Sequence, residues 1–568
     1  MVLDRRTFLA SLPVAAGAFA LAGCTGGDSA PAGSGPVEGD TQNLNVCVAG
    51  FGNNYDVQDM GWRWMMAACY AGIYRDVADE ENGEQFILDG AESIDISDDQ
   101  TVYTFHLRQD AKWSDGEPVT AHDYVYGWKR LVNPEYGYSY SWYIDNVVGV
   151  AEYKAGTGSA DDIALVALDD YTFQVTLTEP DATFEAKLVA TPLYPTRQDI
   201  AEAAGDQWGK DWSLCVYNGP FCMSELVEDN RMVWTKNPEY WDADNVKLES
   251  VTWNLIDEDS TAAGMFDNGE LDVLQTSGDY SVQYAEKAEA GEIQRLVTDY
   301  PGTQWLVFDN KNGGKSGVIG NAKVRKALSY ALDRDDIIEV VFGRYKPAYS
   351  IISPAIQFDG SSYRDQVDEP LKDEYDKYVG DAEALQKLFQ EGLSELGMDT
   401  DLSQVTITLL TQGSTTEVNS LREYVQQMWQ QVLGITVELN TVGDYTLFEA
   451  EREAGNYDAY YNGWYSDYND PLDYLNCFYT GEFESVSGGY SNAEFDGYID
   501  ALEGETDNAV RLDLYTKAET LLMEDAAVVP IYFAEKEYFL QNWVKGFCWS
   551  SFGASQEFYH TSIEGRGN

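Results

Sequence analysis

Histidine is scarce in this sequence of 568 residues, and so are the motifs of metal and nucleophilic chemistry. Only three histidines occur, His106, His122 and His560, and none stands at metal-ligand spacing from another. The chain contains no Cys-x-x-Cys pair and no Gly-x-Ser-x-Gly elbow. We therefore predict no catalytic residues, no metal site and no cofactor, and we expect a protein that is not an enzyme.

Basic residues are also few, because 36 Lys and Arg stand against 97 Asp and Glu, for a net charge of −61. Such a surface repels the phosphates of nucleic acid, so no nucleic-acid partner is expected. It also disfavours electrostatic docking on anionic lipid, which makes a covalent anchor the expected attachment to a membrane. We interpret the excess of acid as the solvated surface of a secreted protein.

Long apolar runs are absent except near the start of the chain. Residues 8–23 follow a pair of arginines and are too few for a bilayer span of ~20 residues, as in an export signal. The run ends Leu-Ala-Gly-Cys, which resembles a lipobox, so we expect Cys24 to carry lipid and to become the first mature residue. Residues 1–23 are thus the predicted signal peptide, and 24–44 the lipidated cysteine and a flexible tether. The paired arginines leave both Sec and Tat export open.

Signals for strands and helices alternate along the rest of the chain, which predicts a mixed α/β protein. Residues 101–107 alternate between apolar and polar side chains, the pattern of a half-buried strand. A helix is expected to begin at Thr120, with Asp123 in its first turn, and to stop before Pro134. The chain exceeds a single core of ~250–300 residues, so two or three lobes are expected.

One local pattern imitates a nucleotide-binding motif, and one pair of cysteines could form a disulfide. Residues 313–316, GGKS, follow an apolar strand like a phosphate loop, but Asp309 stands where that loop requires its first glycine. We therefore do not expect nucleotide binding there. Cys215 and Cys222 flank a turn and could pair in an exported protein, but their spacing alone leaves the disulfide open.

Several stretches resemble, in order, one protein family: the peptide- and nickel-type extracytoplasmic binding proteins of ABC importers. Any one of them is a weak signal, whereas their order over nearly the whole mature chain is specific. They are KWSDGEPVTAHD at 112–123, NGPF at 218–221 with NPEYW at 237–241, the Gly-Glu-Leu-Asp step at 269–272, the helix at 324–334, GWYSDYNDP at 463–471, and the closing helix and strand at 515–532.

The resemblance implies an α/β fold of the periplasmic-binding-protein type, class II and cluster C, with two main lobes and an extra subdomain closing on a central cleft. The chain would cross between the main lobes near Pro301 and Lys536, and these crossings would act as a hinge. The implied division is lobe I in 45–74, 190–300 and 537–568, lobe II in 75–189, and lobe III in 301–536.

Many members of this family bind short peptides, and the resemblance implies the same ligand here. Asp467 matches the family's aspartate that pairs with the ligand's α-amino group, and Gly463, Trp464 and Tyr465 match the neighbouring loop. Tyr140 falls where an aromatic contact from lobe II is expected. The implied partners are a small peptide, ABC permease subunits and the membrane through the lipid anchor. We expect a monomer, outside the cytoplasm and anchored to the cell membrane.

One position departs from the family's pattern. Some oligopeptide-binding relatives carry an arginine three residues before the loop tryptophan, where it helps to hold a ligand carboxylate, and here that residue is Tyr461. The preferred peptide length is therefore open. Within the family, a metal chelate, a sugar or another cationic small molecule stays an alternative ligand. A secreted hydrolase that uses two of the many carboxylates is a remote alternative.

The lipobox gives the first testable prediction. Cys24→Ser should release the mature protein from the membrane or leave it unprocessed, while ligand binding is unchanged, because the anchor and the pocket are separate. Membrane fractionation with mass spectrometry of the mature N-terminus measures this. An unmodified N-terminal residue beyond Cys24 in the native protein would contradict the lipoprotein interpretation. Stable anchoring requires more than one acyl chain, so the mass should show several.

Overall fold

The computed structural model describes residues 41–52, 54–59, 65–81, 83–413, 415–554 and 556–566. The predicted signal peptide, Cys24 and the tether up to residue 40 lie outside these ranges. Within them, no helix has both the length and the apolar character needed to cross a membrane.

The first sheet joins distant parts of the sequence. Its strand order is β1 (Asn43–Val48), β10 (Ser250–Leu255), β9 (Arg231–Lys236) and β8 (Phe221–Val227). β1 runs parallel to β10, whereas β9 is antiparallel to both β10 and β8. Trp234 and Trp253 pack together inside this sheet's core, with ring centroids 5.0 Å apart. The start of the described chain is therefore held by residues about two hundred positions later.

A second sheet has the order β4 (Ala91–Ile96), β5 (Val102–Leu107), β7 (Thr172–Thr176) and β6 (Leu165–Asp169). β5 confirms the strand predicted at 101–107, because Tyr103, Phe105 and Leu107 share its buried face. Phe105 stacks on Phe173 of β7 at 5.6 Å.

Helix α2 (Ala121–Leu131) covers this sheet and confirms the helix predicted after Thr120. The carboxylate of Asp123 accepts the backbone N–H of Thr120 at 2.8 Å, so the first turn is capped as the spacing predicts. Trp128 and Leu131 are fully buried, and the Trp128 indole donates to the carbonyl of Leu193 at 2.7 Å.

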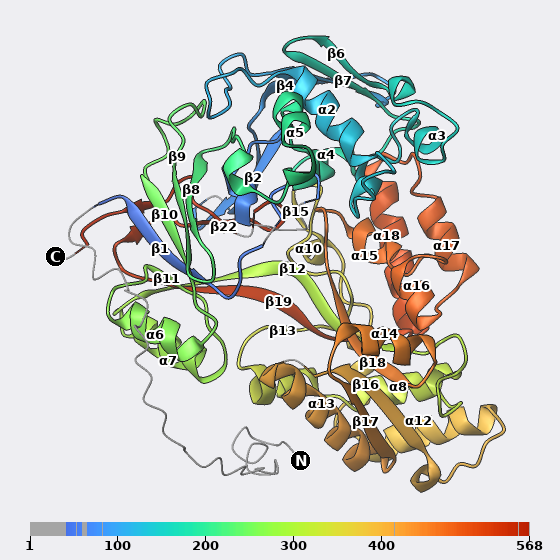
Figure 1. Ribbon diagram of the computed structural model, residues 1–568. Coiled ribbons are helices and arrows are strands. Elements are labelled where there is room, and N and C mark those ends of the chain that lie inside the picture. Colours follow the sequence, from blue (N-terminus) through green and yellow to red (C-terminus); the bar gives the residue numbers. More distant parts are fainter. Residues whose placement is uncertain are drawn as a thin grey trace.

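The largest sheet has the order β11 (Val273–Leu274), β19 (Val528–Leu540), β12 (Gln294–Phe308), β18 (Ala459–Tyr465), β16 (Thr406–Gln412) and β17 (Thr436–Val442). β13 (Lys346–Pro347) adds to β19 from the side. The long strands β12 and β19 run antiparallel across the middle of the molecule, from the part with β1 and β8–β10 to the part with β16–β18 (Figure 1). Their register shifts between Asp299 and Thr303.

Helices pack around these sheets and complete three main cores. The predicted helix at 324–332 is α8 (Ala322–Tyr330), and its successor is α9 (Arg334–Ile337), which continues as a π-turn to Gly343 at φ 67°. The others are α3 (Val150–Lys154), α4 (Phe184–Lys187), α5 (Gln198–Ala204), α6 (Asp259–Asp267), α7 (Gly278–Glu289), α10 (Tyr363–Gln366), α11 (Lys372–Tyr375), α12 (Ala382–Glu395), α13 (Thr416–Met428), α14 (Tyr445–Glu453), α15 (Pro471–Asn476), α16 (Phe483–Gly488), α17 (Ala493–Asp500) and α18 (Asn508–Glu524).

The loop that imitates a phosphate site is occupied by the protein's own carboxylate. The backbone N–H and the hydroxyl of Ser316 both donate to Asp458, at 2.8 and 2.6 Å. A Cβ at Gly314 would lie 2.3 Å from the same carboxylate. The small residues of this loop therefore serve an internal turn.

The C-terminal segment joins β2 and β3 in a further sheet of order β22-β21-β2-β3. It forms the short strands β20 (Val544–Lys545), β21 (Cys548–Trp549), β22 (Gln556–Glu557) and β23 (Ser562–Ile563), and β21 pairs with β2 (Tyr74–Asp79), which pairs with β3 (Gly83–Leu88). A short hairpin, β14 (Gln357–Phe358) with β15 (Ser361–Ser362), lies elsewhere.

A buried ion cluster ties this segment to β2. The Arg75 guanidinium donates to Asp89, to Glu557 and to the carbonyl of Tyr70, all at 2.7–2.8 Å. One guanidinium thus serves two buried carboxylates and cannot neutralise both. Burial raises the pKa of Glu557 to about 7, although the charge of Arg75 opposes the rise.

The raised pKa of Glu557 makes stability depend on pH. The folded state holds this proton more tightly than the unfolded state, so the stabilisation is full below the usual glutamate pKa and is lost as pH rises through about 7. Between pH 5 and pH 8 the wild type should lose up to ~3 kcal/mol of unfolding free energy that Glu557→Gln does not lose. Urea unfolding at both pH values measures the difference, with exposed Glu564→Gln as control; parallel pH profiles for wild type and Glu557→Gln would contradict it.

Candidate functional site

Strand β18 is paired along its full length on only one side. Its partner β12 matches it from Gly302–Tyr465 to Phe308–Ala459, whereas β16 pairs with it only at Ala459 and Tyr460. No other strand of the described chain pairs with residues 461–465. A strand edge of this kind presents backbone donors and acceptors to an extended chain. The predicted site residues Gly463, Trp464 and Tyr465 therefore lie together on an open sheet edge.

Two glycines let the side chains of β12 and β18 interlock. A Cβ at Gly463 would lie 2.3–2.5 Å from the side chain of Gln304, which fills that space. A Cβ at Gly302 would lie 2.2 Å from the ring of Tyr465. Gly463 is thus needed by the sheet itself, and the ring of Tyr465 packs over Gly302 of β12, with its centroid 5.6 Å from that of the Tyr300 ring.

The loop after β18 is fixed by one buried carboxylate. Asp473 accepts the indole N–H of Trp464 at 2.7 Å and the backbone N–H of Asp467 at 2.9 Å. Asp473 belongs to α15, whose start is set by Pro471 and by Asp470 as N-cap. Side chain and backbone of the loop are therefore oriented from the same atom, Oδ2 of Asp473.

Asp467 lies in this loop directly beyond the open edge and is half-buried. Its carbonyl accepts the hydroxyl of Tyr143 at 3.2 Å, while its N–H is bound by Asp473. Burial, followed by the charges of Asp473, Glu484 and Asp467, raises the pKa of the Cys477 thiol. A carboxylate is therefore held at the end of the edge strand in surroundings already rich in negative charge.

Aromatic residues from 138–144 reach the loop from another part of the chain. Tyr140 stacks on Tyr143 at 5.8 Å and Tyr143 on Trp142 at 4.2 Å, and Trp142 lies 6.2 Å from Tyr468. The structure thus places Tyr140 one ring away from the loop, while Tyr143 and Trp142 contact it. Neither Tyr143, Trp142 nor Asp473 was selected from the sequence. The dense run YSYSWY and the Asp-Pro-Leu-Asp start of α15 were the available signals.

Tyr461 and its neighbours form an aromatic cluster instead of a basic one. The hydroxyls of Tyr461 and Tyr532 are 3.1 Å apart, and Tyr532 stacks on Tyr345 at 4.5 Å. Arg344 lies over Tyr345, with its guanidinium carbon 4.5 Å from the ring centroid, and pairs with Glu417 at 3.3 Å. The guanidinium that lies over the Tyr345 ring is thus already bound to a carboxylate.

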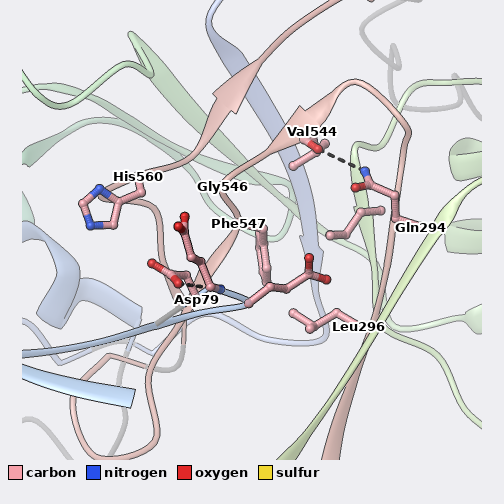
Figure 2. Close-up of a pocket in the computed structure, with 10 residues that line it drawn as sticks. Asp79, Gln294, Leu296, Val544, Gly546, Phe547 and His560 are labelled. Atoms are coloured by element: carbon pink, nitrogen blue, oxygen red, sulfur yellow. Dashed lines mark hydrogen bonds between the residues drawn. The ribbon is translucent and has the colours of Figure 1, made fainter. Parts of the chain in front are cut away.

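A hollow of about 400 Å³ elsewhere in the molecule shares no residue with the loop. Figure 2 shows Asp79 and His560 on one side of it and Gln294 and Val544 on the other, with Phe547 and Leu296 between them. The Gln294 amide donates to the carbonyl of Val544 at 3.0 Å. Asp79, Glu80, Glu81 and His560 all line it, but the described ranges contain no group of three or more His, Cys, Asp and Glu placed to hold a metal ion.

The two cysteines whose pairing the sequence left open are both free thiols. Burial raises the pKa of Cys215 to about 12 and that of Cys222 to about 11. Neither thiol is therefore poised as a nucleophile at neutral pH.

Comparison with known proteins adds a family to this geometry. Residues 85–485 match the model of the bacterial extracellular solute-binding proteins, family 5, middle region. The chain belongs to this family. The resemblance seen in the motifs is thus confirmed, and with it the α/β fold of the periplasmic-binding type.

Relatives of this family 5 chain include two proteins with peptide-binding names. It is 32% identical over 453 residues to the periplasmic oligopeptide-binding protein OppA of Salmonella typhimurium, covering 79% of each chain. It is 30% identical over 458 residues to the dipeptide-binding protein DppE of Bacillus subtilis, covering 80% of each. Among solved structures, Listeria monocytogenes OppA bound to peptide aligns with a TM-score of 0.72 at 27% identity, over 92% of this chain and 99% of that one.

Asp473 gives the prediction of this site. Asp473→Ala removes the acceptor that holds both Trp464 and the Asp467 backbone, so ligand affinity should fall about tenfold or more. Asp473→Asn keeps an acceptor oxygen and should retain most of the affinity. Isothermal titration of each variant with a peptide that binds the wild type measures both affinities.

The control is Asp507→Ala, which removes the exposed capping carboxylate of α18 and should cost about 0.5–2 kcal/mol of stability. Asp473→Ala leaves two donors without their acceptor and should cost about 1–3 kcal/mol, and of the two variants only this one should lose affinity. Equal affinities for the two variants would show that Asp473 does not organise the site.

Proposed function

We propose that this protein captures short peptides outside the cytoplasm and delivers them to the permease of an ABC importer, with no enzymatic activity of its own. The observation that carries this proposal is the open edge of β18, which ends in the fixed loop at Asp467. Two relatives are named as a dipeptide-binding and an oligopeptide-binding protein, and these names support the same ligand class.

The edge and the loop complement the two parts of a peptide. Backbone N–H and C=O groups of residues 463–465 would pair with the ligand as an added strand. This pairing does not depend on the ligand's side chains. Asp467 then provides a negative partner for the α-ammonium group at the strand's end. An ammonium group enclosed without a partner is costly, so the pairing also fixes which end of the peptide lies there.

The cleft is proposed to close by a hinge. Lobe I would comprise 45–74, 190–300 and 537–568, lobe II 75–189, and lobe III 301–536. β12 and β19 would carry the two crossings, because they are the long strands shared between these parts (Figure 1). Tyr143 and Trp142 of lobe II contact Asp467 and Tyr468 of lobe III, which supports a closed arrangement around the loop.

The same proposal includes the placement in the cell. Lipidation at Cys24 would hold a monomer at the outer face of the membrane through the tether at 24–44. The shortage of basic residues supports a lipid anchor over electrostatic docking, since the net charge is −61.

Asp467 gives the test of the function. Removing one partner of an enclosed ion pair typically costs ~3–5 kcal/mol, so Asp467→Ala or Asp467→Asn should weaken a free-amine peptide at least a hundredfold. N-acetylation of the peptide should weaken wild-type binding similarly. The two changes should not add, because they remove the same contact.

Isothermal titration of both proteins with both peptides completes this cycle. A wild type that binds acetylated and free peptides equally, or fully additive losses, would exclude Asp467 as the amine anchor. A native extract serves as the positive control for binding. If the wild type bound neither peptide while the extract gave a binding signal, the proposal that the ligand is a peptide would be refuted.

A further inference from the structure

One side chain of the loop after β18 is buried in another part of the molecule. Tyr468 follows Asp467 directly and is only 5% exposed. Among the described residues of the range 301–536, Tyr468 alone belongs to the core cluster that contains Phe105 and Trp234 of the first two sheets. The loop therefore inserts one ring into a core that the other buried residues of 301–536 do not share.

The ring of Tyr468 is received by residues of the proposed lobe II. The centroid of the Trp142 ring lies 6.2 Å from that of Tyr468, and the Lys187 ammonium lies 5.3 Å from the centre of the Tyr468 ring. Lys187 is itself paired with Asp181 at 2.9 Å, and both of these side chains are mostly buried. A cation over an aromatic face is attracted to it, more strongly where water is excluded. We call Trp142, Asp181 and Lys187 the ring site.

Asp181 holds the cation of the ring site in place. The amide of Asn146 donates to this carboxylate at 2.8 Å, and the backbone N–H and hydroxyl of Thr183 donate to it at 2.8 and 2.6 Å. Burial acts to raise the pKa of Asp181, but Lys187 and Thr183 outweigh burial and lower that pKa. The carboxylate therefore stays charged, and it keeps Lys187 over the ring of Tyr468.

On the other side, the backbone of Tyr468 is fixed to its own part of the chain. Its carbonyl accepts the hydroxyl of Ser466 at 2.7 Å and the backbone N–H of Asp470 at 2.9 Å. Asp470 is in turn paired with Arg511 of α18 at 2.6 Å. Because these bonds fix the loop to α15 and α18, the ring leaves the ring site when one part of the chain moves relative to the other.

A second side chain makes the reverse insertion. Val189 stands two residues after Lys187 and is fully buried. Of the described residues in 75–189, it is the only buried one in the core cluster that contains Trp305 and Tyr460. Each part of the chain thus buries an apolar side chain in the core of the other, and separation of the two parts exposes both side chains to water at a cost in free energy.

We propose that Tyr468 is a positioning residue that acts as a latch between the lobes: its ring occupies the ring site while the cleft is closed, and the ligand leaves only after the ring has left that site. The inference rests on the proposed binding by lobe closure and adds to it the residue that sets the lifetime of the closed complex. Since its ring is buried against protein, the latch stabilises the closed complex of every ligand by the same factor.

Dissociation kinetics of alanine peptides of three to five residues test the latch, by surface plasmon resonance on the immobilised full-length mature protein. Tyr468→Leu removes the ring and should raise the dissociation rate about tenfold. The association rate should change less than about threefold, because the ligand enters the open protein, in which the ring has already left its site. Tyr468→Phe keeps the ring and should dissociate like the wild type.

Variants of the ring site test the same contact from the other side. Lys187→Met combined with Asp181→Asn removes the cation without leaving a buried carboxylate unpaired, and it should raise the dissociation rate about threefold. Added to Tyr468→Leu, this pair of changes should have no further effect, because the contact is already lost. Lys187→Arg keeps the cation and should retain wild-type kinetics.

Tyr490→Leu is the matched control. Tyr490 is also a buried tyrosine of 301–536, but its ring contacts Phe478 and Phe495 of its own core, at 6.5 and 5.6 Å. This variant loses a buried ring of the same size, so it should lose stability as Tyr468→Leu does while its dissociation rate stays that of the wild type.

The outcomes separate the latch from the proposed function. Unchanged dissociation in Tyr468→Leu, or an equal increase in Tyr490→Leu, would overturn the latch and leave peptide binding standing. Isothermal titration should also find that Tyr468→Leu weakens free and N-acetylated peptides by the same factor. A loss confined to free-amine peptides would overturn the latch, because Tyr468 would then act only through Asp467. If no peptide bound the wild type, the proposed function would fail and the latch with it.

Discussion

The half-paired state of β18 is the constraint on which the site depends. A strand inside a large sheet normally has two neighbours, and an exposed edge is a hazard because other chains can add to it. Here the edge is short, since only residues 461–465 of β18 lack a second strand, and the loop that follows it is contacted by Trp142 and Tyr143. The unpaired backbone is therefore confined to five residues that lead into a loop held from another part of the chain.

An open edge recognises any extended chain, so selectivity must come from its ends and sides. Asp473 supplies order at one end, because it orients the Trp464 ring and the Asp467 backbone together. Such preorganisation lowers the entropy cost of binding, as the loop is already held before the ligand arrives. Under the proposed function, the charge at this end would set the direction of the ligand along the strand, which the backbone alone cannot do.

The fold could be predicted from the sequence more completely than the site. The strand at 102–107 and the cap at Thr120 and Asp123 follow from local spacing, and the structure confirms both. Residues 463–467 are contiguous, so a motif could locate them. Tyr143 was missed because alternation in YSYSWY does not say which ring faces outward, and only the 3.2 Å contact with Asp467 decides it.

Under the proposed function, selectivity would rest on the amine end of the ligand more than on its carboxyl end. At Tyr461, where the resemblance implies an arginine in some oligopeptide-binding relatives, the phenol hydroxyl lies 3.1 Å from that of Tyr532, and Arg344 is paired with Glu417. Position 461 therefore offers no guanidinium to a ligand carboxylate, and no single peptide length would be selected there. The register of a bound peptide would then be set at its other end, by the charge of Asp467 next to the open edge of β18.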